Sequence, residues 1–168
     1  MPTRARIPKR PRTPGPDLTL ESPSFAPGKR IPALCTADGE DLSPALHWGD
    51  LPRETRSLAI LVEDPDAPTP EPYVHWLVAD IDPEIVGHGL RQGVGAIAGS
   101  VQGMNSIGRT GYNGPAPPRG HGTHHYYFRL LALDAPLGLR HGFTKGEMLN
   151  AMRGHLLAAG ELIGTYSR

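Results

Sequence analysis

Carboxylate and imidazole side chains lie in this sequence where apolar runs begin or end. Asp64 and Asp66 follow the apolar run in "LAILVEDPDAP". His75 is near the start of "YVHWLVADI", and His124 and Tyr126 begin "HHYYFRLLALD". A carboxylate that accepts an imidazole N–H favours the charged form of the ring. Such a pair suits anion binding, proton transfer or metal binding.

Three strongly predicted strands carry these residues. Residues 57–63 are apolar on both faces, which is typical of a central strand covered on both sides. Residues 73–81 and 125–134 are the other two. Because side chains alternate along a strand, residue parity predicts which groups share a face. The predicted faces are Asp64 with Leu58, Ile60 and Val62; His75 with Tyr73, Leu77, Ala79 and Ile81; and His124 with Tyr126, Phe128, Leu130 and Ala132.

The remaining elements complete a mainly β fold. Further strands are expected at 17–23, 46–48, near 96–102 and at 161–166. Thr144 and Glu147 form a capping box that predicts one late α-helix running to about Ala159. We therefore expect a sandwich of two antiparallel sheets. If the polar strand ends converge, they form a cluster at the rim of its core.

Composition and charge narrow the function. Residues 1–12 contain five basic residues and no acid, which leaves 12 basic and 17 acidic residues in the remainder. An acidic body argues against nucleic-acid binding. No apolar run approaches the roughly 20 residues that span a bilayer, and the start lacks a signal-peptide pattern. We expect residues 1–16 to be a disordered basic, Pro-rich tail, residues 17–168 to be a single domain, and the protein to be cytoplasmic.

A loop rich in glycine and proline, "GPAPPRG" (114–120), leads into the strand that begins with His124. Glycine permits turns that point backbone N–H groups outward, and proline stiffens the chain. A rigid loop beside imidazoles suits a phosphate-like anion. His121 lies in this segment, and we expect it to be exposed without binding a ligand.

Several roles for these residues remain open from the sequence alone. His75 and His124 are either structural groups bonded to backbone carbonyls or parts of a binding site. Two histidines and an aspartate can also bind zinc, but their long spacing disfavours a metal. No nucleophile motif such as "GxSxG" is present, and Cys35 has no base nearby in sequence. Phosphoester hydrolysis using Asp64, His75 and His124 is the enzymatic alternative.

The two blocks "LVEDPDAP…HW" and "GYNGPAPPRGHGTHHYYFRLLALD", in this order and spacing, resemble the phosphatidylethanolamine-binding protein family. The closest branch is the bacterial Raf-kinase-inhibitor-like proteins. The resemblance continues through "LTLESPSF", "TADGEDLSPALHW" and "GHLLAAGELIGTY". It implies a two-sheet sandwich with a small pocket for phosphate, acetate, cacodylate or a phosphorylethanolamine head group. It implies no cofactor and no metal.

Carried onto this chain, the resemblance assigns the ligand-binding residues by motif. They are Asp64, His75, Gly114, Pro118, His124 and Tyr126, with Asp66, Ala67, Pro68 and Tyr73 around them. His125 stands where this branch usually has arginine, and we expect it to lie outside the pocket. The resemblance further implies a regulatory or inhibitor-like module without catalysis, and a homodimer. Inhibition of a kinase or protease through the pocket rim is an alternative function.

Overall fold

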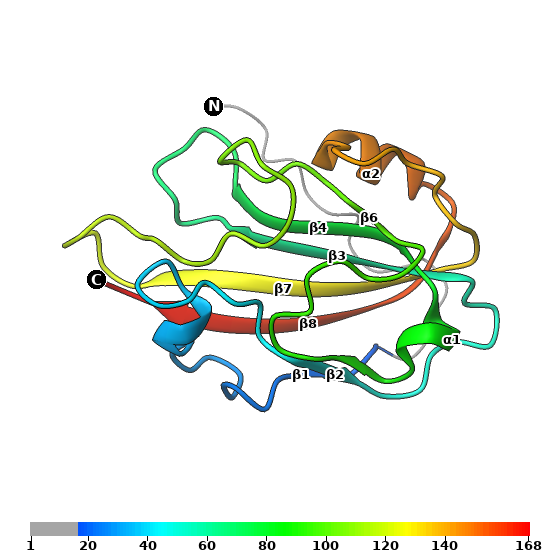
Figure 1. Ribbon diagram of the computed structural model, residues 1–168, viewed down its shortest axis with the longest axis horizontal. Coiled ribbons are helices and arrows are strands. Elements are labelled where there is room, and N and C mark those ends of the chain that lie inside the picture. The colour runs from blue at the N-terminus through cyan, green and yellow to red at the C-terminus, as the bar shows by residue number, and fades with distance from the viewer. Residues whose placement is uncertain (1–16) are drawn as a thin grey trace.

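The structure is a computed structural model that describes residues 17–168 (Figure 1). The predicted tail at 1–16 lies outside the described residues. Two antiparallel sheets form the fold, so the mainly β sandwich expected from the sequence is confirmed. The elements are β1 (Leu20–Glu21), η1 (Ala33–Cys35), β2 (Leu46–Trp48), β3 (Ser57–Asp64), β4 (Tyr73–Ile81), α1 (Pro83–Val86), β5 (Gly89–Leu90), β6 (Val101–Gln102), β7 (His124–Leu133), α2 (Lys145–Ala151) and β8 (Leu156–Tyr166).

The larger sheet has the strand order β6-β4-β3-β7-β8, and the smaller has the order β1-β2-β5. All eight residues of β3 are buried, as expected for an apolar strand in the middle of a sheet. In Figure 1 the small sheet lies below the large one, and α2 lies on the other side. The large sheet is therefore covered on both faces.

Two apolar clusters explain these layers. One fills the space between the sheets and includes Leu20 and Trp48 from the small sheet with Ile60, Phe128 and Leu162 from the large sheet. The other joins the outer face of the large sheet to α2; it includes Ala59, Leu61, Leu77, Phe143, Met148 and Met152. Burial of these side chains drives the packing of both layers.

The late helix is much shorter than the sequence predicts. Thr144 caps it as expected, because its hydroxyl accepts the Glu147 amide at 3.1 Å. However, α2 ends at Ala151, and β8 begins at Leu156 in the segment assigned to the helix. β8 pairs with β7 from His124↔Tyr166 to Leu133↔Leu156, so the backbone hydrogen bonds of a long sheet edge outweigh the local helical pattern.

The weakly predicted strands are shorter than expected. The strand expected at 17–23 is β1, of two residues, and the one expected near 96–102 is β6, also of two residues. No helix within residues 17–168 is long and apolar enough to cross a membrane.

Residue parity is only partly right for β4: Leu77 and Ala79 share a face as predicted, but Ile81 lies on the other face. Leu77 and Ala79 pack in the cluster under α2, while Trp76 and Val78 face the space between the sheets. The register of β4 against β3 shifts twice. The first shift lies between the pairs Leu58↔Ile81 and Ile60↔Val78. The second lies between the pairs Val62↔Trp76 and Glu63↔Val74. Each shift adds one residue to β4, and an added residue interrupts the two-residue alternation.

Candidate functional site

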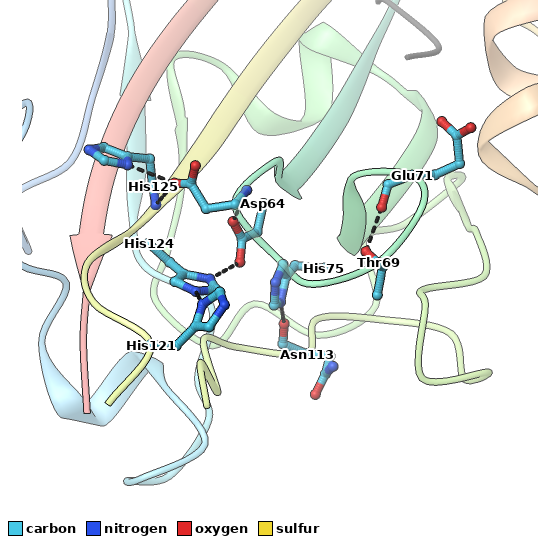
Figure 2. Close-up of polar contacts among 9 residues, drawn as sticks. Asp64, Thr69, Glu71, His75, Asn113, His121, His124 and His125 are labelled. Carbon is cyan, nitrogen blue, oxygen red and sulfur yellow. Dashed lines mark hydrogen bonds and ion pairs between the residues drawn. The ribbon is translucent and has the colours of Figure 1, made fainter. Parts of the chain in front are cut away.

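The ends of three adjacent strands bring the predicted polar residues together (Figure 2). β3 lies between β4 and β7 and runs antiparallel to both. The end of β3 at Asp64 therefore lies beside the starts of β4 and β7, which carry His75 and His124. We call Asp64, His75, His124 and Tyr126 the imidazole cluster.

A β-bulge turns His75 toward this cluster. Because Val62 pairs with Trp76 and Glu63 pairs with Val74, His75 is the extra residue of β4. Bulges commonly redirect a side chain next to a functional site. The His75 ring lies edge-on to the Tyr126 ring at 5.2 Å between centroids. The prediction that His75 lies near Asp64 and His124 thus holds, although the face assigned to its strand neighbours does not.

Asp64 and His124 form a buried ion pair or hydrogen bond. Asp64 Oδ2 lies 2.6 Å from His124 Nδ1, and both residues are buried. A carboxylate only accepts, so His124 carries a proton on Nδ1. The second oxygen, Asp64 Oδ1, accepts the Asp66 amide at 2.8 Å. Both carboxylate oxygens are therefore used, and the ring orientation of His124 is set from behind.

His121 contacts the other ring nitrogen of His124. Its Nδ1 lies 2.6 Å from His124 Nε2, and the ring centroids are 4.9 Å apart. His121 is exposed as predicted, and its ring contacts the imidazole cluster, a contact that the sequence pattern did not predict. Only the turn in which the His121 amide donates to the Pro118 carbonyl at 3.1 Å brings the ring to His124. No residue spacing in the sequence signals that turn.

His75 anchors the loop that precedes the site. Its Nδ1 donates to the Asn113 carbonyl at 2.5 Å, and the Asn113 amide donates to the His75 carbonyl at 2.9 Å. Burial lowers the pKa of His75, and this effect exceeds the opposing effects of the Asn113 hydrogen bond and the Asp64 charge. His75 is therefore neutral at pH 7, with a lone pair on Nε2.

The lowered pKa of His75 predicts a loss of stability in mild acid. The unfolded chain takes up a proton on this residue near pH 6.5, and the folded protein resists it. The stability is therefore full above about pH 6.5 and declines as the pH falls toward the lower folded value, by at most about 1.4 kcal/mol per pH unit. Urea unfolding between pH 7.5 and 5 would measure this. The pH slope should be smaller in His75→Gln, and an unchanged slope would contradict the assignment.

Tyr126 contributes a hydroxyl that stays protonated. Burial and the nearby Asp64 charge raise its pKa, so it acts as a neutral hydrogen-bond group. Within residues 17–168, neither the Tyr126 hydroxyl nor His75 Nε2 is hydrogen-bonded to another group. The one buried side-chain polar atom without a partner there is the Thr55 hydroxyl. Tyr126 and His75 are both almost fully buried, with relative exposures of 1% and 3%.

The Gly/Pro loop is packed more tightly than the sequence suggests. The Gly114 amide donates to Asp41 Oδ1 at 2.7 Å, so it is already used. A Cβ at Gly114 would lie 2.3 Å from that oxygen and 2.6 Å from the Cys35 carbonyl oxygen, which explains the need for glycine. Pro118 is exposed and accepts the His121 amide. Gly114 thus fixes the loop, and Pro118 directs His121.

The outer predicted residues lie around the cluster. The Asp66 carboxylate accepts both the ring N–H and the amide of His125, at 2.7 and 2.8 Å, and Figure 2 shows His125 pointing away from His124. These hydrogen bonds lower the pKa of Asp66 despite its partial burial. Ala67 is half-buried and Pro68 is exposed in the turn after β3. The Tyr73 ring is 4.9 Å from that of His75.

Nucleophilic and metal chemistry have little support here. Cys35 is buried, and burial followed by the Asp41 charge raises its pKa, so the thiol stays protonated. In residues 17–168 no group of three or more His, Cys, Asp or Glu side chains is placed to hold a metal ion. The cluster does offer the Tyr126 hydroxyl and the His124 ring at one end of the sheet, and hydroxyl and protonated imidazole groups suit an acceptor such as an oxyanion.

A separate hollow of about 590 Å³ lies on the small sheet. It shares no residue with the imidazole cluster and is lined by His47, Trp48, His88, Gly89, Leu90 and Arg91. This hollow is wide open to solvent. The imidazole cluster instead lies at the ends of β3, β4 and β7.

The fold and the cluster define a class: two-sheet β-sandwiches with a buried Asp–His pair at the end of the larger sheet. The family model described as "Phosphatidylethanolamine-binding protein" matches residues 21–167. The chain belongs to the phosphatidylethanolamine-binding protein family, which confirms the resemblance seen in the sequence.

Relatives and solved structures agree with this assignment. A UPF0098 protein of Methanothermobacter thermautotrophicus is 44% identical over 155 residues, which cover 90% of this chain and 99% of that protein. A putative phosphatidylethanolamine-binding protein homologue from Chlamydia trachomatis has a TM-score of 0.83 and 40% identity, with 90% of this chain and 98% of that chain covered. YbcL of E. coli has a TM-score of 0.81 and 29% identity, with 90% and 99% covered.

Proposed function

We propose that this protein binds a small oxyanion, phosphate or a phosphorylated head group, at the imidazole cluster. The observation that carries the proposal is the oriented ring of His124 beside the Tyr126 hydroxyl, which has no hydrogen-bond partner within residues 17–168. Donors held in place before the ligand arrives reduce the cost of binding.

Electrostatics support an anion over a cation. Asp64 is the buried acid of the cluster, and its two oxygens accept hydrogen bonds from His124 and from the Asp66 amide. Each Asp64 oxygen already accepts one hydrogen bond and the carboxylate is buried, so it is poorly placed to receive a cation from solvent. An oxyanion instead receives a hydrogen bond from Tyr126 and from protonated imidazole nitrogens, and hydrogen bonds to charged groups are the stronger ones.

Family membership supports the choice of ligand. The family description names phosphatidylethanolamine, whose head group is a phosphate monoanion joined to ethanolamine. We propose Asp64, His75, His124 and Tyr126 as the residues around the ligand, with the 114–120 loop as one wall. Gly114 shapes that wall and Pro118 lies at its rim, while Asp66, Ala67, Pro68 and Tyr73 lie outside the first layer.

A phosphoester hydrolase is the second candidate. The observation in its favour is the 2.6 Å contact of Asp64 with His124, because an aspartate-held imidazole is a common general base. Release of phosphate from an aryl phosphate monoester, lost in His75→Ala and in His124→Ala, would support this candidate. Binding without turnover would support the non-catalytic module that we favour.

The wider roles rest on family membership alone. We propose that residues 17–168 act as one domain in the cytoplasm, as a regulatory or inhibitor-like module. A kinase or protease partner at the rim and a homodimer follow from the resemblance to Raf-kinase-inhibitor-like proteins.

The experiment for the main proposal is an NMR titration of the ¹⁵N-labelled chain. We expect saturable shifts with inorganic phosphate and with phosphorylethanolamine, confined to amides near Asp64, His75 and residues 113–126. Ethanolamine alone should cause none. The ligands are raised to about 10 mM, which saturates a site with a Kd near 1 mM. The matched control is His155→Ala, which removes an exposed imidazole paired with Asp134 and should titrate like the wild type. Absent or dispersed shifts would refute the proposal.

A further inference from the structure

We propose that His121 is a third imidazole of the anion site and that an oxyanion enters between His121 and His124 with uptake of one proton by this pair. This inference rests on the proposed function and adds a residue and a proton count to it. Its basis is the 2.6 Å contact of His121 Nδ1 with His124 Nε2, seen in Figure 2.

The contact accommodates a single proton. His124 Nδ1 carries a proton because it donates to the Asp64 carboxylate. Two facing ring nitrogens at 2.6 Å share one proton as N–H···N, since two facing N–H groups would repel each other. In the free protein, one nitrogen of the pair is therefore a donor and the other a lone pair.

An oxyanion needs both nitrogens as donors. An oxygen of phosphate that meets a ring lone pair is repelled, whereas each N–H gives a charge-assisted hydrogen bond. Binding between the rings thus requires one proton beyond the shared one. In this binding step, one His121–His124 pair combines with one proton and one anion. The product is a single complex in which each ring donates a hydrogen bond to an anion oxygen. No bond other than N–H forms or breaks.

Groups on four elements surround the His121–His124 pair. Asp64 at the end of β3 is hydrogen-bonded to His124. The charge of Asp66, in the next turn, also interacts with His124. From β4, His75 is held neutral by burial; from β7, Tyr126 stays protonated. The positive charge of Arg168, after β8, lowers the pKa of Tyr126 by less than burial raises it. Arg168 is itself paired with Asp38. Asp64 and Asp66 are thus the negative charges that interact with His124.

His121 is free to move while His124 is not. His124 is buried in β7, whereas His121 is exposed in a turn with Gly120 and Gly122 at φ of +74° and +88°. Glycine adopts this region at no steric cost, so the turn can open without disturbing the sheet. The Gly120 amide donates to the Arg168 carbonyl at 3.3 Å, a long hydrogen bond. The moving part is therefore the His121 turn.

Calorimetry with inorganic phosphate tests the proton count. Binding heats at one pH in two buffers of different protonation enthalpy yield the protons taken up per site. We assign the shared proton to His124 Nε2 and the lone pair to His121 Nδ1, so the added proton goes to His121. The wild type should therefore take up about one proton more than His121→Gln, whose amide donates without titrating. His121→Ala should bind more weakly than either. His155→Ala, the exposed imidazole control, should match the wild type.

The pH profile provides a second readout. For one linked proton, wild-type affinity should fall by up to about tenfold per pH unit toward higher pH, with a shallower slope in His121→Gln. Equal proton uptake in wild type and His121→Gln, or wild-type affinity and pH slope in His121→Ala, would overturn this inference while phosphate binding itself stands. No phosphate binding by the wild type would overturn both proposals.

Discussion

Changing Asp64 to asparagine is expected to weaken phosphate binding by about tenfold or more at neutral pH. The carboxylate holds His124 with one oxygen and the Asp66 amide with the other, at 2.6 and 2.8 Å. An asparagine side chain has a single acceptor oxygen, so one of these donors loses its partner. A hydrogen bond to a charged group contributes about 1.5–3 kcal/mol, against about 1 kcal/mol for a neutral pair.

A competing effect acts in the opposite direction but is smaller. Removing the Asp64 charge relieves its repulsion of the anion, which favours binding. However, the Asp64 carboxylate lies behind the His124 ring (Figure 2), farther from the proposed anion than the ring is. Two unit charges 4 Å apart interact by about 4 kcal/mol at an effective dielectric constant of about 20, and this energy halves at twice the distance. The lost attraction to a protonated ring at close range therefore exceeds the relieved repulsion, by about 2 kcal/mol.

The measurement is the phosphate Kd of Asp64→Asn from calorimetry or NMR at pH 7 and pH 6. We expect partial recovery at the lower pH, because the proposed anion complex requires one added proton on the His121–His124 pair. The matched control is Asp134→Asn, which alters an exposed Asp–His pair of 2.7 Å with His155 and should keep the wild-type Kd. Tighter binding by Asp64→Asn would contradict the role assigned to the carboxylate.

Changing Glu63 to alanine is expected to lower the free energy of unfolding by about 3 kcal/mol. Glu63 is buried at the end of β3, where it accepts from Arg129 at 2.7 Å and from Lys145. Lys145 is the first residue of α2, and its side chain is 13% exposed. The substitution leaves a mostly buried ammonium without its partner and removes one contact between α2 and the sheet. Unpaired buried charges are costly.

Urea unfolding of Glu63→Ala and Glu161→Ala checks this prediction. Glu161 also pairs with Arg129, at 2.9 Å, but its side chain is 46% exposed. Exposed ion pairs contribute about 0–1 kcal/mol, so this control should lose little. Amide hydrogen exchange in α2, around Met148, should increase in Glu63→Ala alone. Equal losses in the two variants would show that burial of Glu63 is not what makes this pair important.

Sequence periodicity determined most of the sheet and most of the site. The apolar runs at 57–63 and 125–134 become β3 and β7, and parity places Phe128 and Leu130 with Tyr126 on the inner face of β7, as predicted. This works because a regular strand alternates its side chains whatever its neighbours are. The motifs also identified the family, and the antiparallel order of β4, β3 and β7 accounts for the meeting of Asp64, His75 and His124.

Only tertiary contacts decided the rest. The bulge at His75 arises from pairing with β3, and the end of α2 depends on the long pairing of β8 with β7. The partner of Gly114, Asp41, lies 73 positions away in the chain. His121 approaches His124 through a turn whose glycines permit many conformations. Local sequence encodes periodicity, because periodicity is a property of one segment. Register shifts and side-chain partners depend on two segments meeting, so they follow from the packed structure alone.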